Sequence, residues 1–376
     1  MINFVSNLPE NLRSGGFSAM NAAAFSAISR SELSCYVGPI NPRVISWQKA
    51  SSKFRRLAGF QGAFFFFSQR RLEAIADEVH SKCCSDAHLD FFHGFTPWVL
   101  TQPQVPYMAW SDCTFRDYID IFCHREQFQP DDLARIEQTE AGWLRNARHV
   151  LFTSEWAAKR AVVQYALDAR RVRSVGIFGQ IEMPERDVYA GGKEFAFIST
   201  DFEAKGGRTV LSAFRELRKR HSDASLIIVG HRPPDIAAES GVTFVGFLRK
   251  EVPEEYQRLQ QILGHVRAVV HPTKSDISPL LLVEAGYLGC PVISSRRFAI
   301  PELVEDERTG LLLDDSSQVG AVANAMCWML EHNDEYLQMR KAAWTKTRGL
   351  HSKRNFEERL QACICEIFPA SRMLAQ

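Results

Sequence analysis

The sequence predicts an α/β protein built from two doubly wound parallel sheets. Short apolar runs recur without in/out alternation, which is typical of strands that are covered on both faces. The chain has 376 residues, more than one ordinary core holds, so two domains are expected. Amphipathic helical segments lie between the strands, and right-handed crossovers then give doubly wound sheets. In the second half the strands are expected at 225–230, 267–272 and 291–295, and the helices at 207–221, 252–266 and 317–333.

The first half repeats this rhythm less cleanly. Its strands are expected near 2–7, 33–38, 89–94, 106–110 and 149–154, and its helices at 17–29 and 52–82. Residues 178–192 are polar, contain a proline and three glycines and lack a helical period, so they are expected to form a linker. We therefore predict domains at 1–182 and 183–350, followed by a helical segment, 351–376, that folds back on the first domain.

Charge and cysteine content exclude some classes of protein. Lysine plus arginine (45) nearly equals aspartate plus glutamate (44), which disfavours nucleic acid as the main partner. The start of the chain lacks the features of a secretory signal, and no apolar stretch reaches the roughly 18 residues that span a bilayer, which predicts a cytoplasmic protein. Nine cysteines include Cys83-Cys84 and Cys363-x-Cys365, neither with the paired spacing of a zinc site, so no metal is expected.

Residues 53–71 place Phe64–Phe67 between two basic clusters and allow two interpretations. A helix buried between the sheet and its neighbours would use phenylalanines that point in all directions. A basic aromatic helix can instead lie on an anionic bilayer. The second interpretation predicts peripheral contact with the inner face of the membrane or with a lipid acceptor.

The most informative stretch is 271–313, which leaves a strand, turns through Lys274–Ser278 and starts a helix near Pro279. Groups at the carboxyl ends of strands face the ligand crevice of an open α/β sheet. The free N–H groups at a helix start suit a diphosphate. Asp276 and Glu284 stand eight residues apart, and both can face one crevice and accept hydrogen bonds from hydroxyl groups. Two acids at this spacing are common, so the pair alone is weak evidence.

This stretch resembles the donor-site signature of retaining glycosyltransferases of family 4, also called group 1, which have the GT-B fold. That fold has two Rossmann-like domains facing each other across a cleft. The signature is an acid, seven residues and a glutamate, then small residues, a Pro-Val strand and a Pro-Glu turn. The matching positions are Asp276, Glu284, Ala285, Gly289, Pro291, Val292, Pro301, Glu302 and Gly310. The first acid of the family is most often glutamate, so the shorter Asp276 is a departure.

The resemblance implies roles for these residues. Asp276 would position the hydroxyls of the donor sugar and Glu284 those of the ribose. The helix start would bind the diphosphate, which places Ile277, Ser278, Pro279 and Leu280 at the donor. Gly246 and Phe247, after the strand VTFVG, would receive the base.

A second similar segment is 195–214. In the family a Gly-Arg pair ends the first strand of the second domain, and a Lys-Gly pair follows. Lys205 and Gly206 match the second pair, whereas Ser199 and Thr200 replace the first, so the arginine is missing. Lys205 would then carry more of the phosphate charge, helped by Arg208, Lys274 or backbone N–H groups.

The first domain resembles the family more loosely. Gly15 and Gly16 follow the first strand, where the backbone can approach a phosphate or an acceptor, although a plain tight turn fits equally well. The family similarly places a histidine near the transferred sugar, and His93 occupies a like position. Asp112 ends the next strand and could contact the acceptor.

The resemblance implies retaining, metal-independent transfer of a sugar from a nucleotide diphosphate donor, without a cofactor, and His93, Lys205 and Asp276 are the expected catalytic residues. The acceptor would be a carbohydrate or a lipid-linked glycan, in glycan, polysaccharide or glycolipid synthesis. The sequence has no Asp-x-Asp, the motif that many metal-dependent transferases use to hold a nucleotide diphosphate. It also has no G-x-G-x-x-G with a following acid, so the fingerprint of a dehydrogenase is missing. Thr200 leaves open an inactive GT-B carbohydrate- or nucleotide-binding scaffold, and a GT-B sugar-nucleotide epimerase is a further alternative.

Overall fold

The structure is a computed structural model that describes residues 1–12, 15–30 and 32–367. The chain forms two compact units. Unit 1 contains Met1–Gly176 and the segment from Phe356 onward, and unit 2 contains Ile177–Asn355. The chain thus passes from unit 1 to unit 2 after Gly176 and returns before Phe356, whereas the sequence analysis placed these boundaries after residues 182 and 350.

The described part of unit 1 contains a six-stranded sheet in the order β2-β1-β3-β4-β5-β6, and all its pairs are parallel. The strand order reverses between β1 and β3, which pair in a register that places Ile2 beside Leu89. Polar groups that follow these two strands therefore meet at one edge of the sheet. The strands are β1 (Ile2–Val5), β2 (Ser34–Val37), β3 (Leu89–His93), β4 (Tyr107–Ser111), β5 (His149–Phe152) and β6 (Val172–Ser174).

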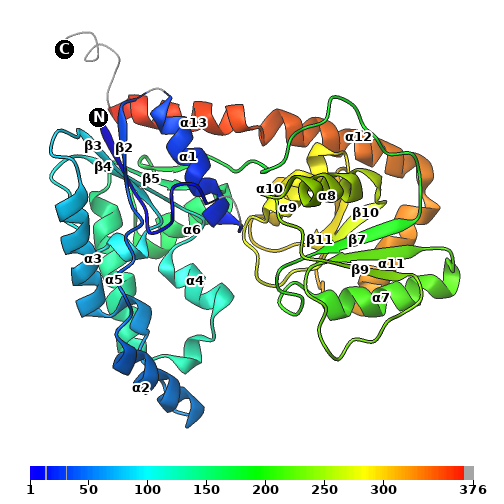
Figure 1. Ribbon diagram of the computed structural model, residues 1–376, viewed down its shortest axis with the longest axis horizontal. Helices are drawn as coiled ribbons and strands as arrows, with labels where there is room; N and C mark the ends of the chain where they lie inside the picture. The colour runs from blue at the N-terminus through cyan, green and yellow to red at the C-terminus, as the bar shows by residue number, and fades with distance from the viewer. Residues whose placement is uncertain (13–14, 31, 368–376) are drawn as a thin grey trace. The chain divides into compact units, whose positions relative to one another are not determined.

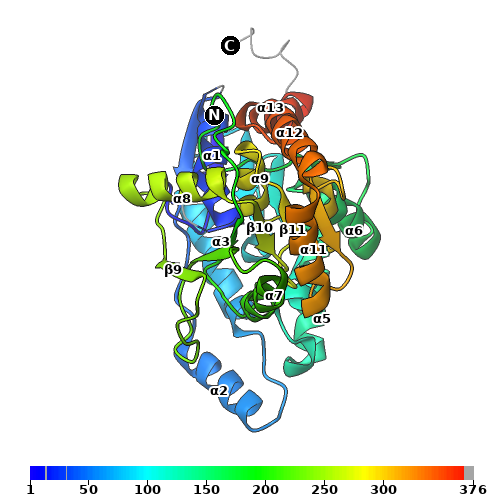
Figure 2. The same ribbon diagram turned by 90° about the vertical axis from the view of Figure 1, so that its right-hand side faces the viewer.

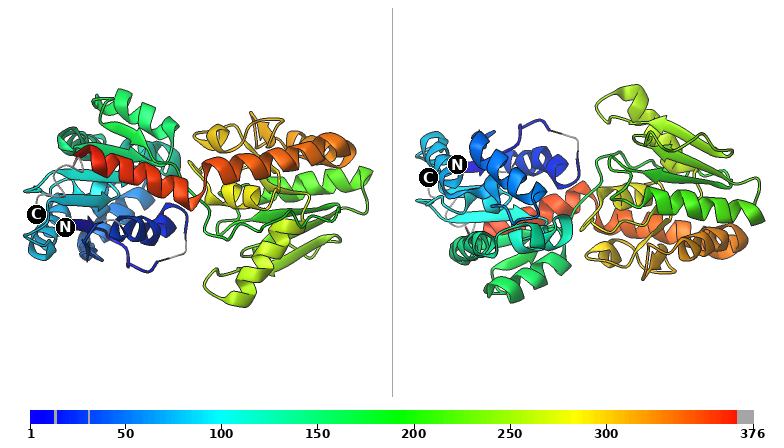
Figure 3. Two further views of the ribbon diagram at one scale, coloured as in Figure 1. Left: turned by 90° about the horizontal axis from the view of Figure 1, so that it is seen from above. Right: turned by 90° about the horizontal axis from the view of Figure 1, so that it is seen from below.

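Helices cover both faces of this sheet (Figure 1). One face packs against α3, α5 and α6, whose apolar residues form a continuous core with the strands. The other face packs against α1 and α13, which lie side by side in Figure 3, and Gln361 of α13 donates a hydrogen bond to the carbonyl of Ala27 in α1 (3.2 Å). The helices are α1 (Met20–Ser29), α2 (Ser46–Leu57), α3 (Gln69–Lys82), α4 (Phe115–Phe122), α5 (Pro130–Asn146), α6 (Glu155–Tyr165) and α13 (Lys353–Ile367).

The prediction of a single helix over 52–82 is wrong, because α2 and α3 are separate helices. Gly62 between them pairs with Phe128 in an isolated bridge and accepts a hydrogen bond from Gln129. A Cβ atom on Gly62 would lie 2.7 Å from the carbonyl oxygen of Ser52, so this close crossing needs glycine. The phenylalanine run forms a short 3-10 turn at Phe65–Phe67 instead of a helix.

The described part of unit 2 contains a second six-stranded parallel sheet, in the order β12-β11-β10-β7-β8-β9. Here the order reverses between β7 and β10. The strands are β7 (Glu194–Ile198), β8 (Ser225–Val229), β9 (Val242–Gly246), β10 (Ala268–His271), β11 (Val292–Ser295) and β12 (Gly310–Leu313). The predicted α/β class with two doubly wound sheets is confirmed.

In unit 2, α7 and α11 pack side by side on one face, and α8 and α9 lie on the other (Figures 1 and 2). The helices are α7 (Gly207–Arg220), α8 (Pro253–His265), α9 (Leu280–Tyr287), α10 (Ile300–Leu303), α11 (Val319–Glu331) and α12 (Asn333–Leu350). Among all described residues, no helix combines the length and apolar character needed to cross a membrane.

The expected linker, 178–192, is held against unit 2. Gly179 donates its N–H to the Tyr287 hydroxyl (2.9 Å), and Glu182 donates to that of Tyr256 (2.8 Å). Further along, the Asp187 carboxylate pairs with Arg340 of α12 (2.6 Å). The linker therefore belongs structurally to unit 2.

Candidate functional site

The candidate site of unit 2 lies at the carboxyl ends of β7 and β10, where the strand order reverses. Asp276 in the loop after β10 is its centre. One carboxylate oxygen accepts from Lys205 Nζ (2.7 Å), and the other lies 2.9 Å from His271 Nε2. Lys205 also donates to the carbonyl of Ser275 (3.2 Å). The loop after β7 and the loop after β10 are thus joined by charged hydrogen bonds.

The electrostatics of this cluster keep Asp276 ionised. Burial alone would raise the pKa of its carboxyl group, but the hydrogen bond and charge of His271 and the ammonium of Lys205 outweigh burial and lower the pKa. His271 is buried, and its Nδ1 has no hydrogen-bond partner among the described residues. Sequence analysis missed His271, because a histidine at a strand end usually belongs to the core.

Two glycines let the backbone fit around this cluster. Gly206 has a φ of +83° and caps α7, and a Cβ atom there would lie 2.9 Å from the carbonyl oxygen of Pro272. Gly230, after β8, has a φ of +137°, and its Cβ would lie 2.0 Å from the carbonyl oxygen of Ser199. Only glycine permits these approaches. They hold the loop that carries Thr200 and Lys205 against its neighbours.

Glu284 of α9 forms a second cluster. It is buried, and its carboxylate accepts hydrogen bonds from the backbone N–H of Gln180 (2.8 Å) and from Lys250 Nζ. Sequence analysis missed Lys250, which lies in a loop without any motif. Among the described residues, none hydrogen-bonds to both Asp276 and Glu284, so each acid has its own cation.

Helix α9 begins near Pro279, as predicted. Pro279 is the N-cap, with extended backbone (φ −69°, ψ 119°), and is therefore not the first helical residue. Helical geometry leaves the N–H groups of Leu280 and Leu281 without acceptors inside the helix. Ile277 and Leu280 are buried, and Ser278 is half-buried.

The other residues of unit 2 that were expected at the donor phosphates differ in their exposure and in whether they already have a partner. Thr200 and Lys274 are exposed, whereas Arg208 is already paired with Glu203 and Asp235 (2.8 and 2.9 Å), which leaves its charge less free to help Lys205.

Gly246 and Phe247 lie at the end of β9. Gly246 has a φ of +82° and open space around it. The Phe247 ring is 44% exposed and lies parallel to His231, with centroids 6.2 Å apart. This end of the sheet therefore presents flat, accessible rings.

Unit 1 contains a pocket of about 450 Å³ at the carboxyl ends of β1, β3 and β4, lined among others by His93 and Asp112. His93 is buried and stacks on Phe17 (centroids 4.4 Å apart), with the edge of Trp110 beside it. Burial lowers the pKa of His93 to about 3, so the ring is neutral, and its Nε2 has no hydrogen-bond partner among the described residues. Burial also raises the pKa of Asp112.

Gly15 and Gly16 do not line this pocket. Gly15 has a φ of +90°, and no atom lies within 4 Å of the place that a Cβ atom of Gly16 would take. Their backbone is accessible, and residues 13 and 14 beside them lie outside the described residues.

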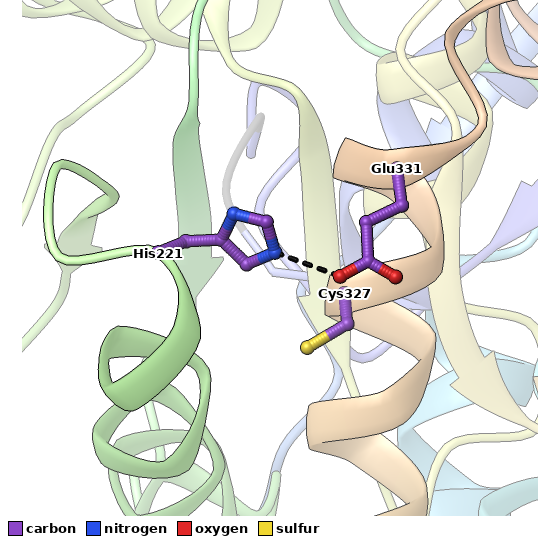
Figure 4. A group of neighbouring side chains, drawn as sticks. All are labelled: His221, Cys327 and Glu331. Carbon is purple, nitrogen blue, oxygen red and sulfur yellow. Dashed lines mark hydrogen bonds and ion pairs between the residues drawn. The ribbon is translucent and has the colours of Figure 1, made fainter.

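A group of His221, Cys327 and Glu331 lies apart from these clusters (Figure 4). Three potential ligand atoms lie within 4.8 Å of one another, and His221 Nε2 is 2.9 Å from the Glu331 carboxylate. Arg220 pairs with the same carboxylate oxygen (2.7 Å). Because this guanidinium already neutralises Glu331, the group is a poor cation site.

Residues 192–332, which contain Lys205, His271, Asp276 and Glu284, match the family described as glycosyl transferases group 1. The match covers most of unit 2, so this part of the chain is similar to a group 1 glycosyl transferase domain. The two acids and the two lysines that pair with them all lie within the matched residues.

Curated glycosyltransferases are similar to part of the chain. A GDP-mannose-dependent alpha-(1-6)-phosphatidylinositol monomannoside mannosyltransferase of Mycobacterium tuberculosis is 29% identical over 146 residues, which cover 36% of this chain and 37% of the relative. A D-inositol 3-phosphate glycosyltransferase of Corynebacterium kroppenstedtii is 25% identical over 147 residues, covering 35% and 32% of the two chains. The similarity thus spans about a third of these relatives.

Solved structures are similar in fold to nearly the whole chain. Sucrose-phosphate synthase from Thermosynechococcus elongatus superposes with a TM-score of 0.70 over 98% of this chain and 99% of its own, at 16% identity. Anabaena HepE in complex with UDP-glucose gives a TM-score of 0.65 over 97% and 100%, at 13% identity. The chain has the GT-B fold.

Proposed function

We propose that the chain is a retaining, metal-independent glycosyltransferase. It transfers a sugar from a nucleoside diphosphate sugar, bound at the carboxyl edge of unit 2, to an acceptor bound in the pocket of unit 1. The observation that carries the proposal is the pairing of Lys205 with an ionised Asp276 at the sheet position where strand order reverses. The family of unit 2 supports it.

The residues of unit 2 suit the binding of a donor. Charge builds on the leaving phosphate as the glycosidic bond breaks, so fixed positive groups act most strongly at that moment. Lys205 and the free N–H groups at the start of α9 supply them. Asp276 would accept hydrogen bonds from the sugar hydroxyls and Glu284 from the ribose, while Gly246 and Phe247 would receive the base.

His93 of unit 1 would orient the transferred sugar. Its neutral ring keeps a buried nitrogen without a partner among the described residues. A sugar hydroxyl can satisfy that nitrogen without bringing charge into a buried position.

The donor base is not a shared property of the relatives and neighbours, because one relative is named for GDP-mannose and one neighbour is bound to UDP-glucose. We therefore propose a nucleoside diphosphate hexose as donor. The acceptor would be a carbohydrate or a lipid-linked glycan.

A panel of nucleotide sugars tests the proposal. Release of nucleoside diphosphate and formation of glycoside should occur with at least one donor, without added metal, and the product should keep the anomeric configuration. Glu284→Gln should lower turnover by more than about 10-fold, because it removes a charge that accepts hydrogen bonds worth roughly 1.5–3 kcal/mol.

The matched control is Glu239→Gln, at an exposed pair with Arg215 in the same unit, which should keep full turnover. Unchanged turnover in Glu284→Gln, with both variants melting like the parent, would remove Glu284 from the site. Nucleotide binding without turnover by any donor would favour the inactive scaffold that Thr200 allows, and interconversion of the donor sugar would indicate the epimerase.

We also propose peripheral contact with an anionic membrane, through α2 and not through the phenylalanine run. Helix α2 has four basic residues and no acidic ones, and it stands away from the sheet of its unit in Figures 1 and 2. Large apolar side chains are exposed on α2 and just after it: Trp47, Phe54 and Leu57 in the helix and Phe60 beyond it are 65–88% exposed. Basic charge beside exposed apolar side chains is the composition of an interfacial helix.

A further inference from the structure

Arg71 is a buried arginine on α3 that lines the pocket of unit 1. Its residue surface is 8% exposed. The guanidinium donates to the carbonyl of Pro42 (2.9 Å), the amide oxygen of Asn41 (2.7 Å) and the carbonyl of Phe66 (2.6 Å). All three acceptors are neutral, and a guanidinium has five N–H groups. These three hydrogen bonds fix the position of the guanidinium, and two of its N–H groups remain for a ligand.

No carboxylate of the described chain forms an ion pair with Arg71, although arginine stays protonated in proteins. Of the two other arginines that are buried among the described residues, Arg340 pairs with Asp187 (2.6 Å), whereas Arg267 has no carboxylate partner and its guanidinium lies 3.5 Å from the centroid of the Tyr336 ring. A desolvated charge without a counterion is costly. Arg71 therefore has the environment of a group whose counterion arrives with a ligand.

The rest of the pocket shows what kind of ligand fits. The half-buried acid Asp112 and the neutral His93 line it too, and Arg71 forms no ion pair with Asp112 in the described structure. The rings of Phe66 and Tyr118, both more than 40% exposed, border the same space. The pocket thus offers a cation for an anionic group, polar groups for hydroxyls and rings for an apolar or sugar face.

We propose that Arg71 binds a phosphate group of the acceptor. A planar guanidinium with two free N–H groups suits phosphate oxygens. The hydroxyl that receives the sugar would lie at Asp112 and His93. Calling the bound ligand an acceptor rests on the proposed transferase function. The binding of phosphate by Arg71 can be tested without any transfer.

The test uses the full chain and inorganic phosphate as the probe. Calorimetric titrations are run with and without a saturating nucleoside diphosphate, which occupies the donor site of unit 2. Phosphate should bind under both conditions. Arg71→Gln should weaken this binding by at least 10-fold, Arg71→Lys by less, and Arg70→Gln not at all, because Arg70 is exposed on the same helix and outside the pocket.

Two further arms identify the source of the phosphate. A soluble polyol phosphate is compared with the same polyol, and vesicles containing phosphatidylinositol are compared with vesicles of phosphatidylcholine. The phosphorylated member of one pair should bind more tightly, and Arg71→Gln should abolish that preference. A preference in the first pair indicates a soluble acceptor, and one in the second pair a lipid headgroup.

The outcomes separate a ligand role from a structural one. Arg71 also ties two loops together, so melting temperature and nucleoside diphosphate affinity are measured for each variant. If Arg71→Gln fails to fold, Arg71→Lys decides by its weaker phosphate binding at unchanged nucleotide affinity. Equal phosphate affinity in the parent and the folded variants, or no binding by the parent, overturns the assignment. Failure to bind nucleotides would instead count against the proposed transferase.

Discussion

At the scale of residues, each cation of the candidate site is held by an acid. Lys205 is fixed by Asp276, and Lys250 by Glu284. The positions of Lys205 and the two acids could be predicted because they belong to a motif with fixed spacing. His271 and Lys250 could not, since their partners come from contacts between loops that no local pattern encodes. A pair of this kind positions a lysine before a diphosphate arrives, which lowers the cost of ordering it.

Glu140 illustrates a buried acid outside the predicted site. It accepts hydrogen bonds from Thr96, from the Phe115 N–H and from Tyr165 (2.6, 2.7 and 2.8 Å), and it joins the loop after β3 to α4 and α6. Burial raises its pKa to about 7 from 4.5, despite these bonds. Between those values the folded state holds a proton that the unfolded state has lost, so the free energy of unfolding should fall as pH rises.

Glu140→Gln removes this ionisation and should flatten the pH dependence. Urea unfolding of parent and variant from pH 5 to pH 8 measures the effect. The parent should lose stability toward pH 8 more steeply than the variant does. Parallel curves for the two proteins would show that Glu140 is not the group responsible.

At the scale of elements, most strands and helices of unit 2 could be predicted because each strand is a continuous apolar run between amphipathic helices. The helix expected over 52–82 failed for a physical reason. Its middle is held by Gly62, which pairs with Phe128, and by the Phe64 N–H, which donates to Asp132 (2.6 Å). Such partners lie more than 60 residues away, and local propensity does not reveal them.

This break leaves α2 with only Ser52 buried and makes it the element to test for membrane contact. Leu57→Asp should weaken binding to phosphatidylglycerol vesicles strongly, because one large apolar side chain contributes about 1.5–3 kcal/mol when buried. Flotation of the protein with vesicles measures this binding. Val163→Asp on α6 is the control. Val163 is 82% exposed, and α6 is distant from α2 in the sequence. Equal flotation of Leu57→Asp and the control would contradict the proposed surface.

At the scale of the whole molecule, two sheets of the same kind each present a site where strand order reverses. Unit 2 offers two lysines that are each held by an acid, and unit 1 offers a pocket with a neutral histidine, an acid and an arginine without an ion-pair partner among the described residues. This division suits a charged donor in one unit and an acceptor in the other. The fold class could be predicted from sequence because it depends on patterns repeated along the chain, whereas the pocket of unit 1 depends on three strand ends that only the fold brings together.

The central claim is that unit 2 binds a nucleoside diphosphate through Lys205. Calorimetric titration of GDP and UDP into the parent, Lys205→Met and Lys193→Met tests it most directly, because Lys193 forms an exposed pair with Asp223 in the same unit. One nucleotide should bind the parent and the Lys193 variant alike and should bind Lys205→Met roughly 10- to 100-fold more weakly, as expected for a charge-assisted hydrogen bond. Equal affinity for all three proteins, or no binding of either nucleotide by the parent, would contradict the claim.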